Sequence, residues 1–279
     1  MRLMMRKTIG FIACFVVLTS YAESSFGANV VEVFSTGGAF AALKSDGSVV
    51  TWGSSDRGGD SSAVSSELAS GVVEVFSTWS AFAALKADGS VVTWGSGYYG
   101  GDSSAVSSDL ASGVVGVFSA AQAFAALKAD GSVVTWGNSL YGGDSSAVSS
   151  DIASGVVEVF STWRAFAALK ADGSVVTWGS SYWGGGDSSA VNSDLASGVV
   201  EVFATASAFA ALKSDGSMVT WGDIYKGGDS SAVSSDIASG VAEVFSSERA
   251  FAALKADGSV VTWGNSVQGG DSSAVSNDL

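Results

Sequence analysis

The sequence contains no histidine, no proline and a single cysteine, Cys14, in its 279 residues. The usual nucleophile–base pairs and the nitrogen or sulfur ligands of metal sites are therefore missing. Carboxylate pairs such as Asp102 and Asp109 remain, but this pair recurs along the chain, whereas an active site is normally single. We expect a protein that is not an enzyme and that needs no metal or other cofactor.

Basic residues are also scarce, because 13 Lys and Arg stand against 27 Asp and Glu. Three of the 13 are Arg2, Arg6 and Lys7, at the start of the chain. Without them, 10 basic residues face 27 acidic ones, a net charge near −17. Nucleic acid requires a basic face, and anionic membrane surfaces attract basic segments. We therefore expect neither nucleic acid nor a membrane as a partner of the mature chain.

The first residues have the layout of a secretory signal peptide, with a basic start, an apolar run over 9–18 and then small residues. The run is shorter than the ~20 apolar residues that span a bilayer. Residues 1–22 are the predicted leader, with cleavage after Ala22 or after Gly27. The predicted location is secreted, either extracellular, periplasmic or at the cell surface. The mature chain then has no cysteine and no disulfide, so packing and backbone pairing must stabilise it.

The sequence is built on a phrase that occurs six times, Thr-Trp-Gly, and nearly everything between the copies repeats as well. The copies end at Gly53, Gly95, Gly137, Gly179, Gly222 and Gly264. A period of about 42 residues marks a solenoid, a propeller or an array. Residues 28–279 are predicted to form a single domain of six modules, namely 28–69, 70–111, 112–153, 154–196, 197–238 and 239–279.

The module 70–111 predicts three strands and a connector. Residues 71–76, 81–86 and 90–94 are rich in β-branched and apolar residues that suit strands, and Asp88-Gly89 is a hairpin signal. The connector over 100–110 places an Asp to cap a short helix, and Val106 and Leu110 are spaced to face inward.

Even spacing of small strands is typical of an all-β propeller, in which stacked blades cover each other's apolar faces. Each predicted blade is a three-stranded antiparallel meander with a short helical connector. Ala83 and Ala84 let neighbouring sheets approach closely, and Phe82 and Trp94 supply bulk. We interpret the Trp of all six Thr-Trp-Gly phrases as structural, since buried aromatics contribute large apolar area.

The run G-V-V-x-V-F…A-F-A-A-L-K-A-D-G-S-V-V-T-W-G resembles the RCC1 repeat, whose typical form contains A-L…D-G-x-V…W-G. The resemblance covers residues 28–279. It implies a β-propeller, usually of seven blades, and the short period is most similar to the three-stranded blades of a secreted bacterial β-lactamase inhibitor protein of this superfamily. Guanine-nucleotide exchange is not carried over, because no residues of this chain match it.

The sequence departs from the family pattern in three ways. Phe stands in every copy where the family often has His, Gly-Gly-Asp-Ser-Ser replaces G-Q-L-G, and there are six copies instead of seven. Three alternatives remain for how the propeller is completed: the ring closes with six blades, two chains combine, or the sequence is a fragment of a longer array.

Two stretches of the module vary between copies. The first loop follows strand one and comprises 36–38, 78–80, 120–122, 162–164, 205–207 and 247–249. The second loop follows Trp-Gly and comprises 55–57, 97–99, 139–141, 181–183, 224–226 and 266–268. In a meander both loops lie at the same end of each blade, opposite the Asp-Gly turns. They form one variable face.

The variable loops hold the Tyr, extra Trp and non-repeated basic residues of the mature chain. Such residues are enriched at binding hot spots, and exposed aromatics usually have a purpose. The predicted binding residues are Trp79, Tyr98, Tyr99, Tyr141, Trp163, Arg164, Tyr182, Trp183, Tyr225 and Lys226. Relaxed drift at exposed loop tips is the alternative to a binding role.

The favoured function is binding of an unidentified protein partner through the variable face. A carbohydrate-binding or adhesive module, with the same aromatics stacked on a glycan, and a purely structural cell-surface repeat are the alternatives. A calcium site at Gly-Gly-Asp is disfavoured, because the nonapeptide spacing of calcium-binding β-helices is missing.

Overall fold

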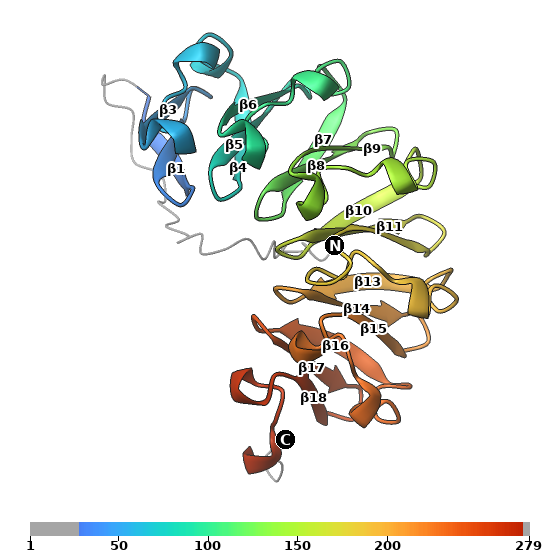
Figure 1. The fold of residues 1–279 in the computed structure, drawn as a ribbon. Coiled ribbons are helices and arrows are strands. Elements are labelled where there is room, and N and C mark those ends of the chain that lie inside the picture. Colours follow the sequence, from blue (N-terminus) through green and yellow to red (C-terminus); the bar gives the residue numbers. More distant parts are fainter. Residues whose placement is uncertain (1–27, 276–279) are drawn as a thin grey trace.

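The computed structural model of the protein describes residues 28–275. The predicted leader and its two cleavage sites lie outside this part of the chain. The described residues form six three-stranded sheets, which stand side by side like the blades of a propeller and follow an open arc (Figure 1). The all-β prediction with six repeats is confirmed.

Each sheet takes its three strands from consecutive segments, so no blade is shared between distant parts of the chain. The strands are, blade by blade, β1 (Val30–Ser35), β2 (Ala39–Lys44) and β3 (Val49–Gly53); β4 (Val72–Ser77), β5 (Ala81–Lys86) and β6 (Val91–Gly95); β7 (Val114–Ser119), β8 (Ala123–Lys128) and β9 (Val133–Gly137); β10 (Val156–Ser161), β11 (Ala165–Lys170) and β12 (Val175–Gly179); β13 (Val199–Ala204), β14 (Ala208–Lys213) and β15 (Met218–Gly222); and β16 (Val241–Ser246), β17 (Ala250–Lys255) and β18 (Val260–Gly264).

The Asp-Gly hairpins form as predicted, each with a three-residue loop. In the second blade the Gly89 N–H donates to the Lys86 carbonyl, and the Lys86 N–H donates to the Ser90 carbonyl. Gly89 has a φ of 78°, which matches a turn closed by a left-handed glycine. The Asp88 carboxylate accepts the N–H and the hydroxyl of Ser90, which fixes the turn from inside.

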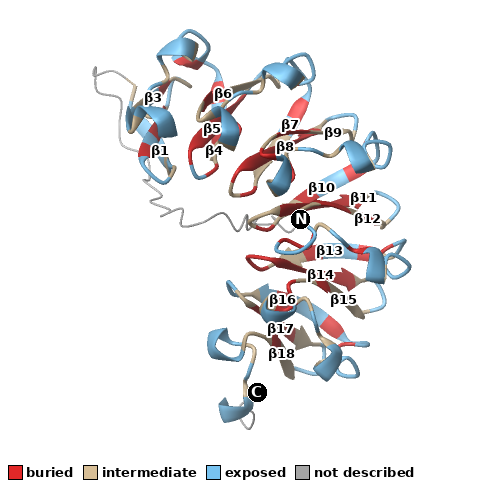
Figure 2. Cartoon of the chain, viewed as in Figure 1, coloured by how far each residue is buried: buried red, intermediate tan, exposed pale blue. Residues whose placement is uncertain are grey.

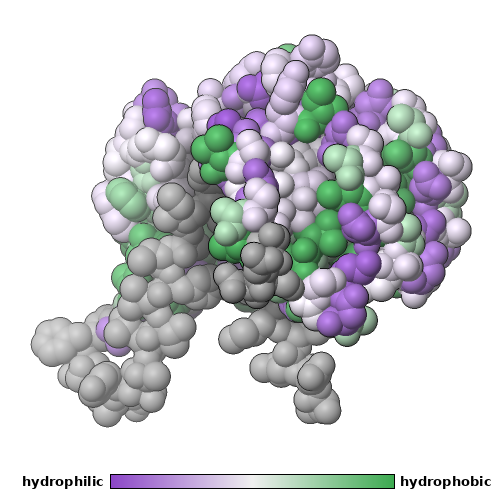
Figure 3. Space-filling view, turned by 90° about the horizontal axis from the view of Figure 1, so that it is seen from below, coloured by the Kyte–Doolittle hydropathy of each residue, from purple (hydrophilic) through white to green (hydrophobic). Residues whose placement is uncertain are grey.

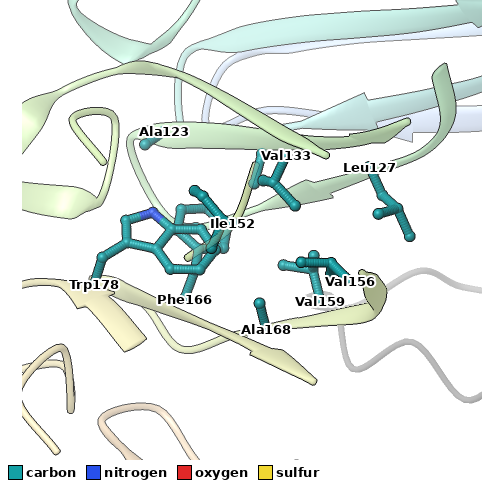
Figure 4. Close-up of a cluster of buried hydrophobic side chains, with 11 residues drawn as sticks. Ala123, Leu127, Val133, Ile152, Val156, Val159, Phe166, Ala168 and Trp178 are labelled. Atoms are coloured by element: carbon teal, nitrogen blue, oxygen red, sulfur yellow. The ribbon is translucent and has the colours of Figure 1, made fainter. Parts of the chain in front are cut away.

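The middle strand of each of the four inner blades buries both faces, which explains why its sequence is almost wholly apolar. Ala81, Ala83 and Leu85 pack against Phe124 and Trp136 of the next blade. The alternate side chains, Phe82 and Ala84, pack against β2 of the preceding blade. In Figure 2 the buried residues follow the strands and extend into some of the loops that join them, while the 3-10 helices are mostly exposed. Figure 4 shows one such layer, in which Phe166 and Trp178 lie against Ile152 and Ala123.

The connectors consist of short 3-10 helices rather than α-helices. They are η1 (Ser55–Arg57), η2 (Ser62–Val64), η3 (Glu67–Ala69), η4 (Gly97–Tyr99), η5 (Ser104–Val106), η6 (Ser139–Tyr141), η7 (Ser146–Val148), η8 (Ser189–Val191), η9 (Ile224–Lys226), η10 (Ser231–Val233), η11 (Ser266–Gln268) and η12 (Ser273–Val275).

The Asp of the connector stabilises its turn, although it does not occupy the cap position itself. Ser103 is the N-cap of η5 and its side chain makes no capping bond. The preceding Asp102 accepts the Ser104 N–H at 2.9 Å. Val106 and Leu110 pack inward as predicted, and Leu110 is buried.

A glycine socket joins each blade to the next, and it accounts for the repeated Gly-Gly-Asp. We give this name to Gly58, Gly100, Gly142, Gly185, Gly227 and Gly269. Gly100 has a φ of 95°, and a Cβ there would lie 2.6 Å from the Phe124 ring. Its carbonyl accepts the indole N–H of Trp136 at 3.0 Å. Equivalent bonds of 3.0–3.1 Å link the other neighbouring blades.

The two ends of the arc lack this partner, and the ring is open. Phe40 and Trp52 of the first blade are 44% and 46% exposed, whereas Phe82 and Trp94 are 0% and 4% exposed. The interpretation that all six repeated Trp are buried structural residues therefore holds for the last five and is wrong for Trp52. Trp52 has the same local sequence as the others, but no blade within residues 28–275 covers it.

Candidate functional site: the variable-loop face

The first and second loops of each blade lie together at one end, as the meander predicts. A hydroxyl at the start of the first loop joins them: the Thr78 hydroxyl donates to the Tyr99 carbonyl at 2.9 Å, and the Thr205 hydroxyl donates to the Lys226 carbonyl at 2.9 Å. Thr36, Thr162 and Ser247 make the same bond. In the third blade, where Ala120 lacks a hydroxyl, the Asn138 amide donates to Gln122 at 2.6 Å.

The first loops are also joined to one another, blade to blade, through their backbone. The Trp79 N–H donates to the Ala121 carbonyl, the Ala121 N–H donates to the Trp163 carbonyl, and the series continues from Gly37 to Glu248 with distances of 2.8–3.0 Å. We call this series the loop belt; its members are Gly37, Trp79, Ala121, Trp163, Ala206 and Glu248. The belt uses only main-chain groups, so its side chains differ while its backbone is constant.

The predicted binding residues divide into exposed and partly buried ones. Trp79, Tyr98, Tyr182, Trp183 and Tyr225 are exposed, up to 77% for Tyr182. Tyr99 and Tyr141 are half-buried and pack against the apolar layers between blades. A substitution at either of these two positions therefore disturbs blade packing as well as the surface.

Four of the predicted residues gather around one hollow of about 300 Å³ between the fourth and fifth blades. It is lined by Trp163 and Arg164 of the first loop, Trp183 of the second loop, and Ser207 and Lys226 of the next blade. The size lies at the lower end of the range for ligand pockets. Trp79, Tyr98 and Tyr225 do not line this hollow.

Both cations of the hollow lie against aromatic rings. The Lys226 ammonium is 5.7 Å from the centroid of the Trp163 ring, donates to the Ser207 hydroxyl at 3.0 Å and is 3.8 Å from the Asp223 carboxylate. These partners fix its position at the wall.

Arg164 lies over an aromatic ring of the preceding blade. Its guanidinium carbon is 5.0 Å from the centroid of the Tyr141 ring. The ion pairs found within residues 28–275 join Lys226 to Asp223 and Arg249 to Glu248. The Arg164 charge is therefore not neutralised by a carboxylate of the described chain. A guanidinium that is stacked on an aromatic ring can still donate hydrogen bonds to a carboxylate in its own plane.

The sequence analysis did not select Ser207 or Asp223 as site residues. Ser207 orients Lys226, and the buried Asp223 carboxylate accepts the Tyr225 N–H at 2.9 Å. Asp223 follows the fifth Trp-Gly, where the other copies have Ser or Asn. Variation at that position was the signal that could have identified it.

No helix within residues 28–275 is long and apolar enough to cross a membrane. No protein-family model matches the sequence, and a comparison with curated proteins finds no match.

Solved structures give similarities of fold. Prp20p from Saccharomyces cerevisiae, in a study of its binding to Gsp1p and histones, is 17% identical, with 84% of this chain and 72% of that chain covered and a TM-score of 0.48. Yeast RCC1 (Prp20) with bound Kap60 is 18% identical, with coverages of 86% and 70% and a TM-score of 0.48. The ectodomain of the Arabidopsis thaliana receptor kinase ACR4 is 14% identical, with coverages of 85% and 80% and a TM-score of 0.43.

All three TM-scores are below 0.5, and no function passes from these proteins to this chain through them. The fold assignment rests on the six sheets described above. The solved structures to which the chain is similar include RCC1, the protein whose repeat its own motif resembles.

Proposed function

We propose that the protein is exported and binds a protein partner, without enzymatic activity, through the variable-loop face. The observation that carries this proposal is the gathering of Trp163, Arg164, Trp183 and Lys226 around one hollow, in a chain whose modules are otherwise nearly identical. Relaxed drift at exposed loop tips is the alternative, and the presence of two indoles and two cations from three separate loops at one place supports binding over drift. Trp and Arg are the residues that dominate binding energies at protein interfaces.

The chemistry of the hollow favours a segment that carries a carboxylate next to an apolar side chain. Trp163 and Trp183 offer apolar surface, and Arg164 supplies a positive charge that no carboxylate within residues 28–275 neutralises, whereas the charge of Lys226 is paired with Asp223. A rigid backbone, held by the loop belt and the hydroxyl bonds, lowers the entropy lost on binding. The expected partner therefore presents an acidic, partly apolar loop or chain end.

The binding test uses the protein purified after export and a displayed library of random twelve-residue peptides. We expect selected peptides to be enriched in Asp or Glu beside apolar residues. Arg164→Ala should weaken their binding at least tenfold, about 1.4 kcal/mol. Arg249→Ala is the matched control, because it occupies the same loop position in the sixth blade and removes the same charge. Equal binding by both variants contradicts the assignment of the hollow.

A glycan array run beside the peptide library separates the two binding functions. Specific glycan capture that is lost in Trp183→Ala, with no peptide selected, would replace the protein partner by a carbohydrate. Far-UV circular dichroism of each variant confirms that loss of binding does not reflect unfolding.

Export is tested on the full chain expressed with its own first 27 residues. The intact mass of protein recovered outside the cytoplasm should correspond to a chain that begins at Glu23 or Ala28. An uncleaved chain retained in the cell contradicts export and leaves the binding test unaffected.

A further inference from the structure

We infer that the two ends of the arc bind each other between molecules, so that the sixth blade of one copy covers the first blade of a second copy. This head-to-tail contact would repeat, between chains, the interface that already occurs between neighbouring blades within the chain. It is independent of the variable-loop hollow, which lies between the fourth and fifth blades.

The first blade presents an uncovered rear face. Val30, Val33, Phe40, Val50 and Trp52 are between 44% and 51% exposed. Their equivalents in the second blade include Val72, Val75, Phe82 and Trp94, all buried against the preceding blade. Phe40 and Trp52 are already stacked, with centroids 5.3 Å apart, as in every other blade. The rear face of the first blade therefore has the same side-chain arrangement as the faces that preceding blades cover elsewhere in the arc.

The sixth blade presents the complementary front face. A Cβ on Gly227, the socket of the fifth blade, would lie 2.6 Å from the Phe251 ring, whereas one on Gly269 would meet nothing within 4 Å. In the turn on the opposite side, Gly258 also faces open space, while Gly216 contacts Gly240 of the next blade. Phe245 is 46% exposed, and Ala252 and Leu254 are less buried than Ala210 and Leu212.

Each end of the arc also has a polar group without the partner that its equivalents have in the internal blades. The group at one end is a donor and the group at the other end is an acceptor. The Trp52 indole has no acceptor within residues 28–275, and the Gly269 carbonyl has no indole donor there, although five such bonds of 3.0–3.1 Å join the internal blades. The belt likewise ends with the Glu248 N–H directed to no following loop of the described chain. If the sixth blade of one copy docks on the first blade of another, one more indole–carbonyl bond and one more bond of the loop belt can form.

The arc leaves a broad opening between its first and last blades, so the two ends of one chain do not meet (Figure 1). Apolar groups lie at the surface between polar ones on the side seen from below (Figure 3). A contact between different patches is heterologous, and it gives a ring when the rotation closes and an open series when it does not. The occupant that fits the rear face is a second copy, because the five internal interfaces show that a front face of this same sequence covers it.

The test uses two variants of the full exported chain, each blocked at one end. Trp52→Glu places a charge on the rear face, and Ala252→Glu places one on the front face. Wild type should sediment as a dimer or larger species across the micromolar range. Each variant alone should sediment as a monomer. An equimolar mixture of the two should form a 1:1 dimer, because each retains one intact end.

Tyr98→Glu is the matched control, since it adds the same charge at an exposed aromatic of the variable face. It should assemble like wild type. A monomeric wild type, or two variants that remain monomeric when mixed although both are folded by circular dichroism, would overturn the inference. Association of Trp52→Glu with itself would overturn it as well, because that contact could not use the rear face.

Discussion

The repeated tryptophans show how one residue type acquires two environments from its place in the array. Trp136 is buried and donates its indole N–H to the Gly100 carbonyl of the preceding blade, whereas Trp52 is 46% exposed and no blade among the described residues covers it. Removing this hydrogen bond is expected to destabilise the fold more than forming it stabilises it, because a buried carbonyl without a donor carries an unfavourable desolvation free energy.

We therefore predict that Trp136→Phe lowers the free energy of unfolding by about 1–3 kcal/mol. Trp52→Phe is the internal control and should change it by less than about 0.5 kcal/mol. Urea unfolding at a concentration where the protein is monomeric measures both. Equal losses for the two variants would show that the socket bond does not stabilise the blades.

Aspartates of the Asp-Gly turns predict how stability depends on pH. The hydroxyl and the N–H of Ser90 lower the pKa of Asp88, and the equivalent serines lower the pKa of Asp46, Asp130 and Asp172 in the same way. The pKa in the folded chain thus lies below that in the unfolded chain. The resulting stabilisation is complete above the ordinary Asp value and is lost as pH falls through the lowered one.

The melting temperature should accordingly be flat near neutrality and fall once the pH drops below about 4. Asp88→Asn should reduce this dependence slightly, since it removes one of several equivalent groups. Differential scanning calorimetry between neutral and acidic pH gives the comparison. A melting temperature that rises on acidification would contradict the role of the turns.

At the scale of the element, the first strands place a row of glutamates along one side of the arc. Burial raises the pKa of Glu201, and the charges of Glu158 and Glu243 on the neighbouring blades raise it further. For an acid whose pKa is raised on folding, the cost of ionisation is absent below the unfolded value and complete above the folded one. The third blade interrupts the row with Gly116.

Glu201→Gln should therefore stabilise the protein at neutral pH and leave its stability unchanged below about pH 4. The gain should stay under ~1 kcal/mol, because Glu201 is exposed and its repulsion by the neighbouring glutamates is screened by solvent. Urea unfolding at the two pH values tests the difference, and added salt should shrink the gain. If Glu201→Gln changed the stability equally at both pH values, the change would come from packing and not from charge repulsion.

The elements themselves could be predicted closely from sequence, because each strand, turn and connector is encoded within one module. Asp88-Gly89 identified its hairpin, and the apolar run of β5 identified a strand. The 3-10 form of the connectors was not predictable, since Ser103, Asp102 and their neighbours suit any short capped turn. Nor was the difference between Tyr98 and Tyr99, because the side chain that packs inward is chosen by the next blade.

At the scale of the whole molecule, the sequence of a single module says least about the structure, because it does not determine how the blades are arranged. The exposure of Trp52, the open ring and the stacking of Arg164 on Tyr141 all depend on the angle and distance between blades, which no single module specifies. The variable face was predictable as a region, since meander topology places both loops at one end. Which of its residues share a hollow was not.

Stability should also be graded along the arc. In a repeat array each unit is stabilised by its neighbours, and the first and sixth blades have one neighbouring blade each. Amides of β2 and β17 should therefore exchange with solvent faster than those of β8 and β11, as measured by hydrogen exchange and mass spectrometry. Raising the protein concentration should slow the exchange at both ends if copies associate. Uniform protection in dilute solution would contradict a graded array.

The loop belt has a consequence for how the surface can change. Its bonds run through main-chain N–H and C=O groups, so a new side chain at position 79, 121 or 163 leaves the scaffold intact, and proline alone would break the series by removing an N–H. Mutation can thus change the side chains of the variable loops one blade at a time at little folding cost. The same property makes the face a natural platform for grafting new specificities by directed evolution.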